Sequence, residues 1–287
     1  MSTDRPQGEV CAVAVVHSER DMQELQRLLL PSWPAAAAGV RAALYIVLNR
    51  PELRLDPALC ATSGLTVLTN PRRRGYADNI NLGLAHADGF RYFLALNPDI
   101  RLAEGNLAAM VAFMDRHDDC GMSTCKLFGL TGDLQANCRR WQSLGVILAR
   151  RLKSFPRREP IIRRYLMLDE AYDRECTPDW VSGCYMFFDR ALLQRVGGMD
   201  DRFDLYCEDC DIARRIWNAG RAVRFTPETY AYHREHRQSV SPFSWHFRTH
   251  LRSWLRFCYK RLFVYPRMPI LSPAHGTEGS VSAGALQ

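Results

Sequence analysis

The amino-acid sequence predicts an α/β protein with a Rossmann-like, mostly parallel sheet that is flanked by helices and followed by a C-terminal helical extension. Two observations support this class. Between Val10 and Arg116, short apolar runs alternate with segments of helical periodicity, which is typical of a doubly wound parallel sheet. The apolar run at 94–96 then stops at Asn97-Pro98-Asp99, where proline cannot continue a sheet ladder. Polar side chains therefore follow a strand at the carboxyl edge, where open α/β sheets bind ligands.

Each element is expected from its local pattern. The run VCAVAVV at 10–16 is continuously apolar and rich in valine, as in a strand buried on both faces. Helices are expected to end before Pro31 and at Gly220, because proline and glycine end helices. The expected strands are 10–16, 44–48, 65–68, 91–96, 180–188 (broken at Gly183) and 222–225, and the expected helices are 21–30, 79–86, 104–116, 208–219 and 243–265. The segment 126–175, rich in arginine and proline, is expected to be a partly ordered insertion.

The composition is that of a soluble globular protein, with 287 residues, 47% hydrophobic and 24% charged. The first ten residues contain no apolar secretory signal, and no stretch reaches the roughly 18 apolar residues of a membrane span. We therefore expect a cytoplasmic protein. The net charge of +7 is concentrated in arginine clusters, which favour anionic partners such as phosphates, nucleic acid or an anionic membrane.

The ten cysteines are expected to be reduced, because disulfides are rare in the cytoplasm. A structural zinc site is an alternative for part of them. Cys207 and Cys210 form a CxxC pair, which His233 and His236 could complete as a tetrahedral set. No second CxxC supports this site.

Three polar elements indicate chemistry. Asp99 follows a strand, Glu208-Asp209 begins a helix with Asp211 close behind, and His233 follows another strand. A carboxylate and an imidazole can hold Mg²⁺ or Mn²⁺ together with substrate phosphates. A second carboxylate, with its pKa raised by burial or by neighbouring carboxylates, could take a proton from an attacking hydroxyl. Taken singly, each residue could equally be a turn, cap or surface residue.

The order of these motifs resembles that of a known family. GYADNINLG at 75–83, LALNPDI at 94–100, WVSGCYMFFDRALLQRVGGMDDRFDLYCEDCDIARRIWNAG at 180–220 and HREHRQS at 233–239 are similar to those of inverting family 2 glycosyltransferases, in the rhamnosyltransferase-like and galactofuranosyltransferase-like branch. The resemblance implies a GT-A fold. It implies that Asp99 and His233 hold Mn²⁺ or Mg²⁺, and that Asp209, beside Glu208, is the catalytic base.

The resemblance also implies the substrate-binding residues. Donor-binding residues are expected at Val16, His17, Asn49, Arg74, Gly75, Asn81 and Asn97, and acceptor-binding residues at Trp180, Gly183 and Asp211. Two positions depart from the family pattern. Leu48-Asn49 replaces the usual Asp-Asn that holds the nucleobase, and Arg73-Arg74-Gly75 replaces Asn-x-Gly. An arginine of 72–74 is expected to hold the diphosphate.

The implied organisation is a catalytic domain over 1–240, with a nucleotide-sugar half at 10–125 and an acceptor half at 126–240. A basic amphipathic extension at 241–272 and a disordered tail at 273–287 would follow. The extension carries Trp, Phe and Leu among Arg and Lys, so it could rest on the anionic inner face of the plasma membrane or simply pack on the core.

The implied reaction is inverting transfer of a sugar from a nucleotide-sugar to a hydroxyl of a cell-envelope polysaccharide or lipid-linked glycan. Rhamnose from deoxythymidine-diphosphate rhamnose is the first choice of donor. Three alternatives remain open: a nucleotidyltransferase acting on sugar phosphates, a basic nucleic-acid-binding protein, and a non-catalytic member of the family. The acidic motifs do not favour nucleic acid, because carboxylates repel phosphate unless a cation intervenes.

Overall fold

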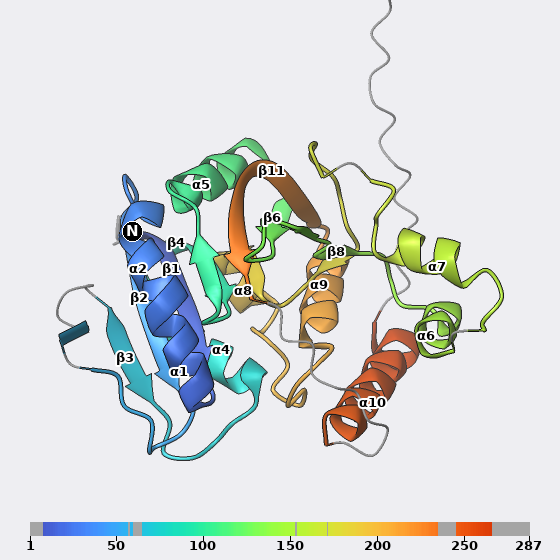
Figure 1. Cartoon of the computed structure of the whole chain (residues 1–287), viewed down its shortest axis with the longest axis horizontal. Helices are drawn as coiled ribbons and strands as arrows, with labels where there is room; N and C mark the ends of the chain where they lie inside the picture. The colour runs from blue at the N-terminus through green and yellow to red at the C-terminus, as the bar shows by residue number, and fades with distance from the viewer. Residues whose placement is uncertain are drawn as a thin grey trace, which may run out of the picture.

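The computed structural model describes residues 8–56, 58–59, 65–152, 154–170, 172–234 and 245–265. A nine-stranded mixed sheet runs through the molecule in the order β3-β2-β1-β4-β10-β6-β11-β5, with β7 paired to β6 (Figure 1). Its strands are β1 (Gly8–Val16), β2 (Ala42–Leu48), β3 (Thr66–Thr69), β4 (Phe90–Leu96), β5 (Ile100–Leu102), β6 (Cys120–Phe128), β7 (Leu134–Gln135), β10 (Tyr185–Asp189) and β11 (Ala222–His233). A two-stranded ribbon joins β8 (Cys138–Arg139) to β9 (Trp180–Val181).

The first four strands of this order are parallel, as the sequence predicts. All four therefore end at one edge of the sheet. A polar residue follows each strand directly: His17 after β1, Asn49 after β2, Asn70 after β3 and Asn97 after β4. This edge is the place at which open α/β sheets bind ligands.

The second half of the sheet is mixed rather than purely parallel. β10 is antiparallel to both β4 and β6, and β6 is parallel to β11. β11 extends to His233, well beyond the expected end at Phe225, because irregular register between Thr226 and Tyr230 lets the strand continue past Pro227. The extension pairs His233 with Ile100 of β5, immediately after Asp99.

Helices cover both faces of the sheet (Figure 1). Alternate residues of β1 point to two cores: Val10, Ala12 and Ala14 to one, and Cys11, Val13 and Val15 to the other. The first core includes side chains of α1 (Glu19–Glu24), the π-helical turn η1 (Leu25–Leu29), α2 (Leu30–Ala36) and α5 (Asn106–Arg116). The second includes side chains of α4 (Tyr76–Leu84), α6 (Leu144–Arg151), α7 (Arg158–Tyr165), α8 (Arg190–Arg195), α9 (Glu208–Asn218) and α10 (Trp245–Tyr259).

Two segments are more regular than expected. The first helix does not end at Pro31: η1 and α2 follow α1 without a break to Ala36, and this proline comes just after the π-helical turn, where the regular α-helical hydrogen-bond pattern is already interrupted. The expected loose insertion at 126–175 contains the end of β6, then β7, β8, α6 and α7. Its arginine-rich helices therefore belong to the folded body.

The C-terminal extension forms α10 and a π-helical turn, η2 (Lys260–Val264). Ser253, Phe257 and Lys260 are buried on one side, whereas Leu255 and Phe263 are exposed on the other. The extension thus packs on the core and still presents an apolar face. The remaining parts of the expected extension and tail, 241–244 and 266–287, lie outside the described residues. No helix within the described ranges is long and apolar enough to cross a bilayer.

Candidate functional site

Asp99 and His233 meet at the carboxyl edge of the sheet. The turn after β4 carries Asp99, and the last residue of β11 is His233. His233 Nε2 lies 3.5 Å from Asp99 Oδ1, and each side chain is 13% exposed. This Oδ1 is buried and has no hydrogen-bond partner among the described residues. A buried carboxylate oxygen without a partner is costly unless a ligand completes it.

Gln135 determines which nitrogen of the His233 ring carries the proton. Its Nε2 donates to the His233 backbone carbonyl at 2.9 Å, so its Oε1 is the atom that lies 3.0 Å from His233 Nδ1. An amide oxygen can only accept, so Nδ1 must carry the proton and donate. In the neutral ring, Nε2 therefore presents its lone pair toward Asp99.

A carboxylate oxygen and an imidazole lone pair that face one another fit a divalent cation. With only two protein ligands, Mn²⁺ or Mg²⁺ would complete its coordination with substrate phosphate oxygens. The part of the chain that the structure describes brings no three His, Cys, Asp or Glu side chains into one metal-binding group. The described members of the alternative zinc set, Cys207, Cys210 and His233, thus do not form one, and His236 lies outside the described residues.

The turn before β10 connects the edge that carries Asp99 and His233 to the expected base. The Asn97 N–H donates to the Cys184 carbonyl at 3.0 Å. One residue earlier, the Gly183 N–H donates to Asp209 Oδ2 at 3.2 Å, and the Gly183 carbonyl accepts from the Tyr76 hydroxyl at 3.1 Å. Gly183 and Cys184 thus join the turn after β4, the start of α4 and the start of α9.

Glu208 and Asp209 differ in their surroundings. Glu208 is buried, and its Oε2 has no hydrogen-bond partner in the described structure. Burial, reinforced by the neighbouring Asp209 charge, raises the pKa of Glu208 to about 8. Burial also raises the pKa of Asp209, but the N–H groups of Cys210 and Gly183 donate to its two oxygens and act against that shift. Asp209 is therefore the carboxyl of the pair that ionises more readily, and only an ionised carboxylate can accept a proton.

The backbone before this pair is strained. Tyr206 and Cys207 have φ angles of 70° and 66°, in the left-handed region that side chains other than glycine rarely adopt. Such conformations persist only where surrounding contacts hold them, and they are common at active sites. Here they turn the chain into α9 so that Glu208 and Asp209 occupy its first turn.

Asn49 binds the loop that follows β3. Its Oδ1 accepts from the Arg74 N–H at 2.9 Å, and its Nδ2 donates to the Arg74 carbonyl at 2.8 Å and to His17 Nδ1 at 2.6 Å. Burial lowers the pKa of His17, which keeps the ring neutral and able to accept this bond. Asn49 and Val16 are 0% exposed, so neither offers a side-chain surface to a donor.

The other expected donor residues border this edge. The side chains of Arg72, Arg73 and Arg74 are exposed, as diphosphate contacts require. Gly75 is the N-cap residue of α4, and a Cβ there would lie 3.1 Å from the Asp204 backbone, so the loop before α9 approaches closely only because this residue is glycine.

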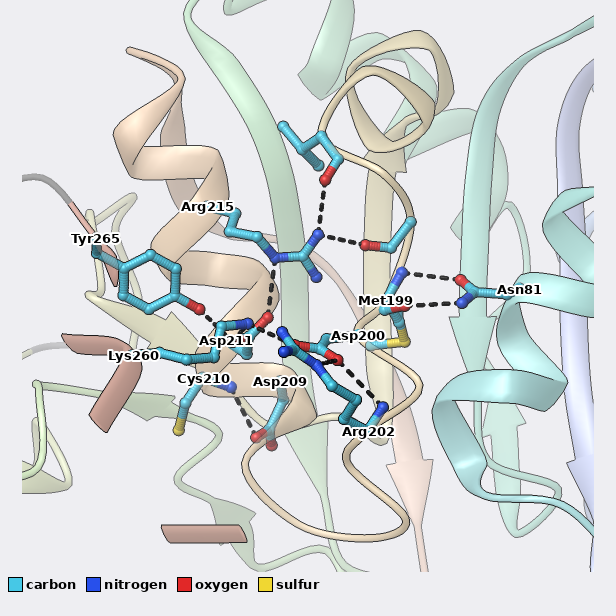
Figure 2. Close-up of polar contacts among 12 residues, drawn as sticks. Asn81, Met199, Asp200, Arg202, Asp209, Cys210, Asp211, Arg215, Lys260 and Tyr265 are labelled. Carbon is cyan, nitrogen blue, oxygen red and sulfur yellow. Dashed lines mark hydrogen bonds and ion pairs between the residues drawn. The ribbon is translucent and has the colours of Figure 1, made fainter. Parts of the chain in front are cut away.

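Asn81, Trp180 and Asp211 make internal contacts instead of facing an open site. Asn81 exchanges hydrogen bonds of 2.7 and 2.8 Å with the Met199 backbone, and Trp180 Nε1 donates to the Arg140 carbonyl at 2.9 Å (Asn81 is shown in Figure 2). Asp211 is 0% exposed and binds Lys260, Tyr265 and Arg215. The prediction that Asp211 contacts the acceptor is therefore corrected, because a fully buried carboxylate cannot reach a substrate.

Sequence reasoning missed several residues of this region. Gln135 lies in the segment expected to be loose, and no sequence signal marks it. Asn70 and Asn79 share a 2.5 Å hydrogen bond that continues the Asn49 network, and Asn79 lies in the quoted GYADNINLG motif. The positive charge of Arg139 acts on Asp209 from the β8–β9 ribbon, and a basic pair at 139–140 was the only signal for it.

Two family models match the chain over most of its length. A model described as glycosyl transferase family 2 matches residues 56–160, and one described as glycosyl transferase family group 2 matches residues 165–276. The first match contains the Asn97-Pro98-Asp99 turn, and the second contains Glu208, Asp209 and His233.

Two similar proteins are named as rhamnosyltransferases. The chain is 25% identical over 200 residues to Rhamnosyltransferase WbbL of Escherichia coli (strain K12), an alignment that covers 67% of this chain and 73% of the relative. It is 26% identical over 182 residues to the N-acetylglucosaminyl-diphospho-decaprenol L-rhamnosyltransferase of Mycobacterium tuberculosis (strain ATCC 25618 / H37Rv). That alignment covers 62% of this chain and 58% of the relative, so the chain spans less than two thirds of the relative's length.

Solved glycosyltransferases share the fold. GalNAc-T7 with UDP, GalNAc and Mn²⁺ has a TM-score of 0.58 at 15% identity, and covers 87% of this chain and 47% of that chain. The mannosyltransferase PcManGT from Pyrobaculum calidifontis with GDP-Man and Mn²⁺ has a TM-score of 0.55 at 16% identity, and covers 93% of this chain and 67% of that chain. From its fold, its family matches and its relatives, the chain belongs to the family 2 glycosyltransferases, in their rhamnosyltransferase-like branch.

Proposed function

We propose that the chain is a metal-dependent, inverting glycosyltransferase in which Asp209 is the catalytic base. The observation that carries this proposal is the connection of Asp99, His233 and Asp209 through the turn at Gly183 and Cys184. Single-step transfer of a sugar from a nucleotide-sugar requires a cation beside the diphosphate and an ionisable carboxylate beside the acceptor. The turn at Gly183 and Cys184 has a candidate for each on either side.

In this reaction the acceptor hydroxyl attacks the anomeric carbon from the side opposite the diphosphate. The new glycosidic bond forms as the bond to the diphosphate oxygen breaks, so the configuration inverts without a covalent enzyme intermediate. Asp209 takes the hydroxyl proton, and Glu208 remains protonated beside it. Asp99 and His233 would hold Mn²⁺ or Mg²⁺, which when bound neutralises negative charge on the departing diphosphate.

The donor and acceptor are proposed from the relatives. Both similar proteins are named as rhamnosyltransferases, which supports deoxythymidine-diphosphate rhamnose as the first donor to test. The name of one relative contains a diphospho-decaprenol, which supports a lipid-linked glycan as acceptor. Arg72 to Arg74 line the edge at which the diphosphate would bind.

A panel of nucleotide-sugars, each with and without Mn²⁺ or Mg²⁺, tests the proposed activity. Release of a nucleoside diphosphate from deoxythymidine-diphosphate rhamnose is the expected result. Release of pyrophosphate from a nucleoside triphosphate would instead support a nucleotidyltransferase. Binding of a nucleotide-sugar without turnover on any acceptor would support a non-catalytic role.

The C-terminal helix supports a cytoplasmic location at an anionic membrane face. Residues 245–265 contain no Asp or Glu, and Arg248, Arg252 and Arg261 are exposed there. The exposed apolar side chains beside them are Leu251, Leu255, Tyr259, Leu262, Phe263 and Val264. Such a face would bind anionic lipid through both charge and apolar area. Sedimentation with vesicles of phosphatidylglycerol, but not with vesicles of phosphatidylcholine, is expected, and Leu262→Ser with Phe263→Ser should reduce it.

A further inference from the structure

We propose that Lys260 of the C-terminal segment is a positioning residue for the catalytic base, acting through Asp211 of α9. The inference rests on the proposed function, because it assumes that Asp209 is the base. It adds a role that the sequence motifs do not contain, since Lys260 lies 51 residues after Asp209 in the chain.

Lys260 pairs with two buried carboxylates at once. Its ammonium group lies 2.6 Å from Asp200 Oδ2 and also donates to Asp211 Oδ1, as Figure 2 shows. The Lys260 side chain is 6% exposed, and those of Asp200 and Asp211 are 8% and 0% exposed. Arg202 also pairs with Asp200 and Arg215 with Asp211, so Lys260 is the cation that the two carboxylates share. Removing one partner from such a buried ion-pair network leaves the remaining charges less well compensated.

The second partner from the same segment is Tyr265, whose hydroxyl donates to Asp211 Oδ1. Burial and the Asp211 charge raise the pKa of Tyr265, so the hydroxyl keeps its proton. Lys260 begins the π-helical turn η2, and such turns are frequent at functional sites. The turn places Lys260 and Tyr265, five residues apart, on the same carboxylate.

Asp211 transmits this contact to the first turn of α9. It lies two residues after Asp209, and its N–H donates to the carbonyl of the strained Cys207 at 2.9 Å. Its Oδ2 accepts from Arg215, which also donates to the carbonyls of Val196 and Gly198. The position of Asp211 therefore fixes the strained turn from which the Asp209 side chain projects.

The C-terminal segment holds the loop before the base at further points. Ser253 donates to the Leu205 carbonyl at 2.8 Å, and the Tyr206 and His250 rings pack edge to face at 5.1 Å. Figure 1 shows α10 beside this loop and α9. The strained residues Tyr206 and Cys207 are thus held by the C-terminal segment as well as by α9. A base displaced by about 1 Å can lose about 100-fold in rate without loss of substrate binding.

Lys260→Met removes the charge and keeps most of the volume. We expect kcat to fall about 10- to 100-fold while the donor KM stays within about twofold, because the diphosphate-binding edge is formed by other elements. Lys260→Arg, which restores a cation, should recover much of the rate. Arg116→Met, which breaks an exposed 2.5 Å ion pair between α5 and Glu228 of β11, is the control for loss of a cation outside the Asp211 network and should leave kcat unchanged.

Hydrogen exchange gives a readout that does not depend on the assay. Amide exchange of Gly183 and Cys210, whose N–H groups bind Asp209, should accelerate in Lys260→Met. If Lys260→Met does not fold, Tyr265→Phe removes only one hydroxyl from Asp211 and should lower kcat in the same direction. Unchanged kcat and unchanged exchange at these amides in folded Lys260→Met would overturn the inference.

The two proposals can fail separately. Asp209→Asn, assayed in parallel, tests the base itself. If Asp209→Asn is inactive and Lys260→Met retains the full rate, only the positioning role of Lys260 is wrong. If Asp209→Asn retains the full rate, the base assignment fails and the Lys260 inference fails with it.

Discussion

His233 Nε2 faces the buried Oδ1 of Asp99 at 3.5 Å, with its lone pair directed there by the hydrogen bond that Nδ1 donates to Gln135. A lone pair and a carboxylate oxygen repel one another at this separation unless a cation or a proton lies between them. Because β11 supplies His233 and the turn after β4 supplies Asp99, the two side chains meet only when the sheet is complete. Gln135 would thereby belong to the proposed cation site without touching the metal.

Gln135→Leu should lower Mn²⁺ affinity about 10- to 100-fold, the range typical for loss of a residue that orients a metal-binding histidine. The leucine fills the space but cannot accept from Nδ1, so both tautomers of His233 become available. Calorimetric titration of Mn²⁺ in the presence of a nucleoside diphosphate measures the effect. Gln194→Leu, at an exposed glutamine of α8, is the control. Equal Mn²⁺ affinity in Gln135→Leu and wild type would show that the tautomer is unimportant.

Asp99→Ala should weaken metal-dependent binding of the diphosphate while leaving the weaker metal-independent binding in place. The reason is that the alanine removes the partnerless oxygen that faces His233. Nucleoside diphosphate affinity measured with Mn²⁺ and then with a chelator separates the two contributions. If the difference between these affinities is the same in Asp99→Ala and wild type, Asp99 is not a metal ligand.

Glu208 should make the protein less stable as pH rises. Its folded-state pKa of about 8 lies above the ordinary glutamate value of 4.5, so the folded protein binds the proton more tightly than the unfolded chain. The stabilisation is complete below about pH 4.5 and is lost as pH rises toward 8, at about 1.4 kcal/mol for each pKa unit.

Thermal unfolding between pH 5 and pH 8 tests this dependence. Glu208→Gln, which is always neutral, should lose less stability over this interval than wild type. Glu104→Gln, at an exposed carboxylate, should follow the wild-type curve. Parallel curves for Glu208→Gln and wild type would mean that Glu208 is ionised throughout.

Asn49→Leu should destabilise the fold by about 1–3 kcal/mol for each buried polar group that it leaves unpaired. The Arg74 N–H and carbonyl and His17 Nδ1 all lose their Asn49 partner. Urea unfolding measures the free energy, and a change below about 0.5 kcal/mol would place Asn49 among ordinary surface positions.

Much of the fold follows from local sequence patterns. The parallel strands β1, β2, β3 and β4 end within a few residues of their expected ends, because continuous apolar runs and the turn residues after them act locally. The meeting of Asp99 with His233 also follows from the motifs, since both come at strand ends. The length of β11 does not, because Pro227 suggests an end, whereas pairing with β6 and β5 carries the strand onward.

The internal role of Asp211 could not be predicted from the sequence. A carboxylate two residues after the expected catalytic pair is easily interpreted as a substrate contact, and only the tertiary position of Lys260 shows otherwise. The sequence did contain one signal, because only three of the 38 basic residues are lysines and one of them, Lys260, lies in 243–265. The structure shows that this lysine is buried. A buried cation that must pair with two carboxylates depends on contacts far apart in sequence, which local patterns do not encode.

The turnover of Asp209→Asn tests the central claim most directly. Asparagine keeps an oxygen for the Gly183 N–H but is a far weaker base, so we expect kcat to fall about 10²- to 10⁴-fold. The dissociation constant of the nucleotide-sugar should meanwhile stay within about twofold of the wild-type value. Near wild-type turnover in Asp209→Asn would contradict the assignment of Asp209 as the base of a single-step transfer.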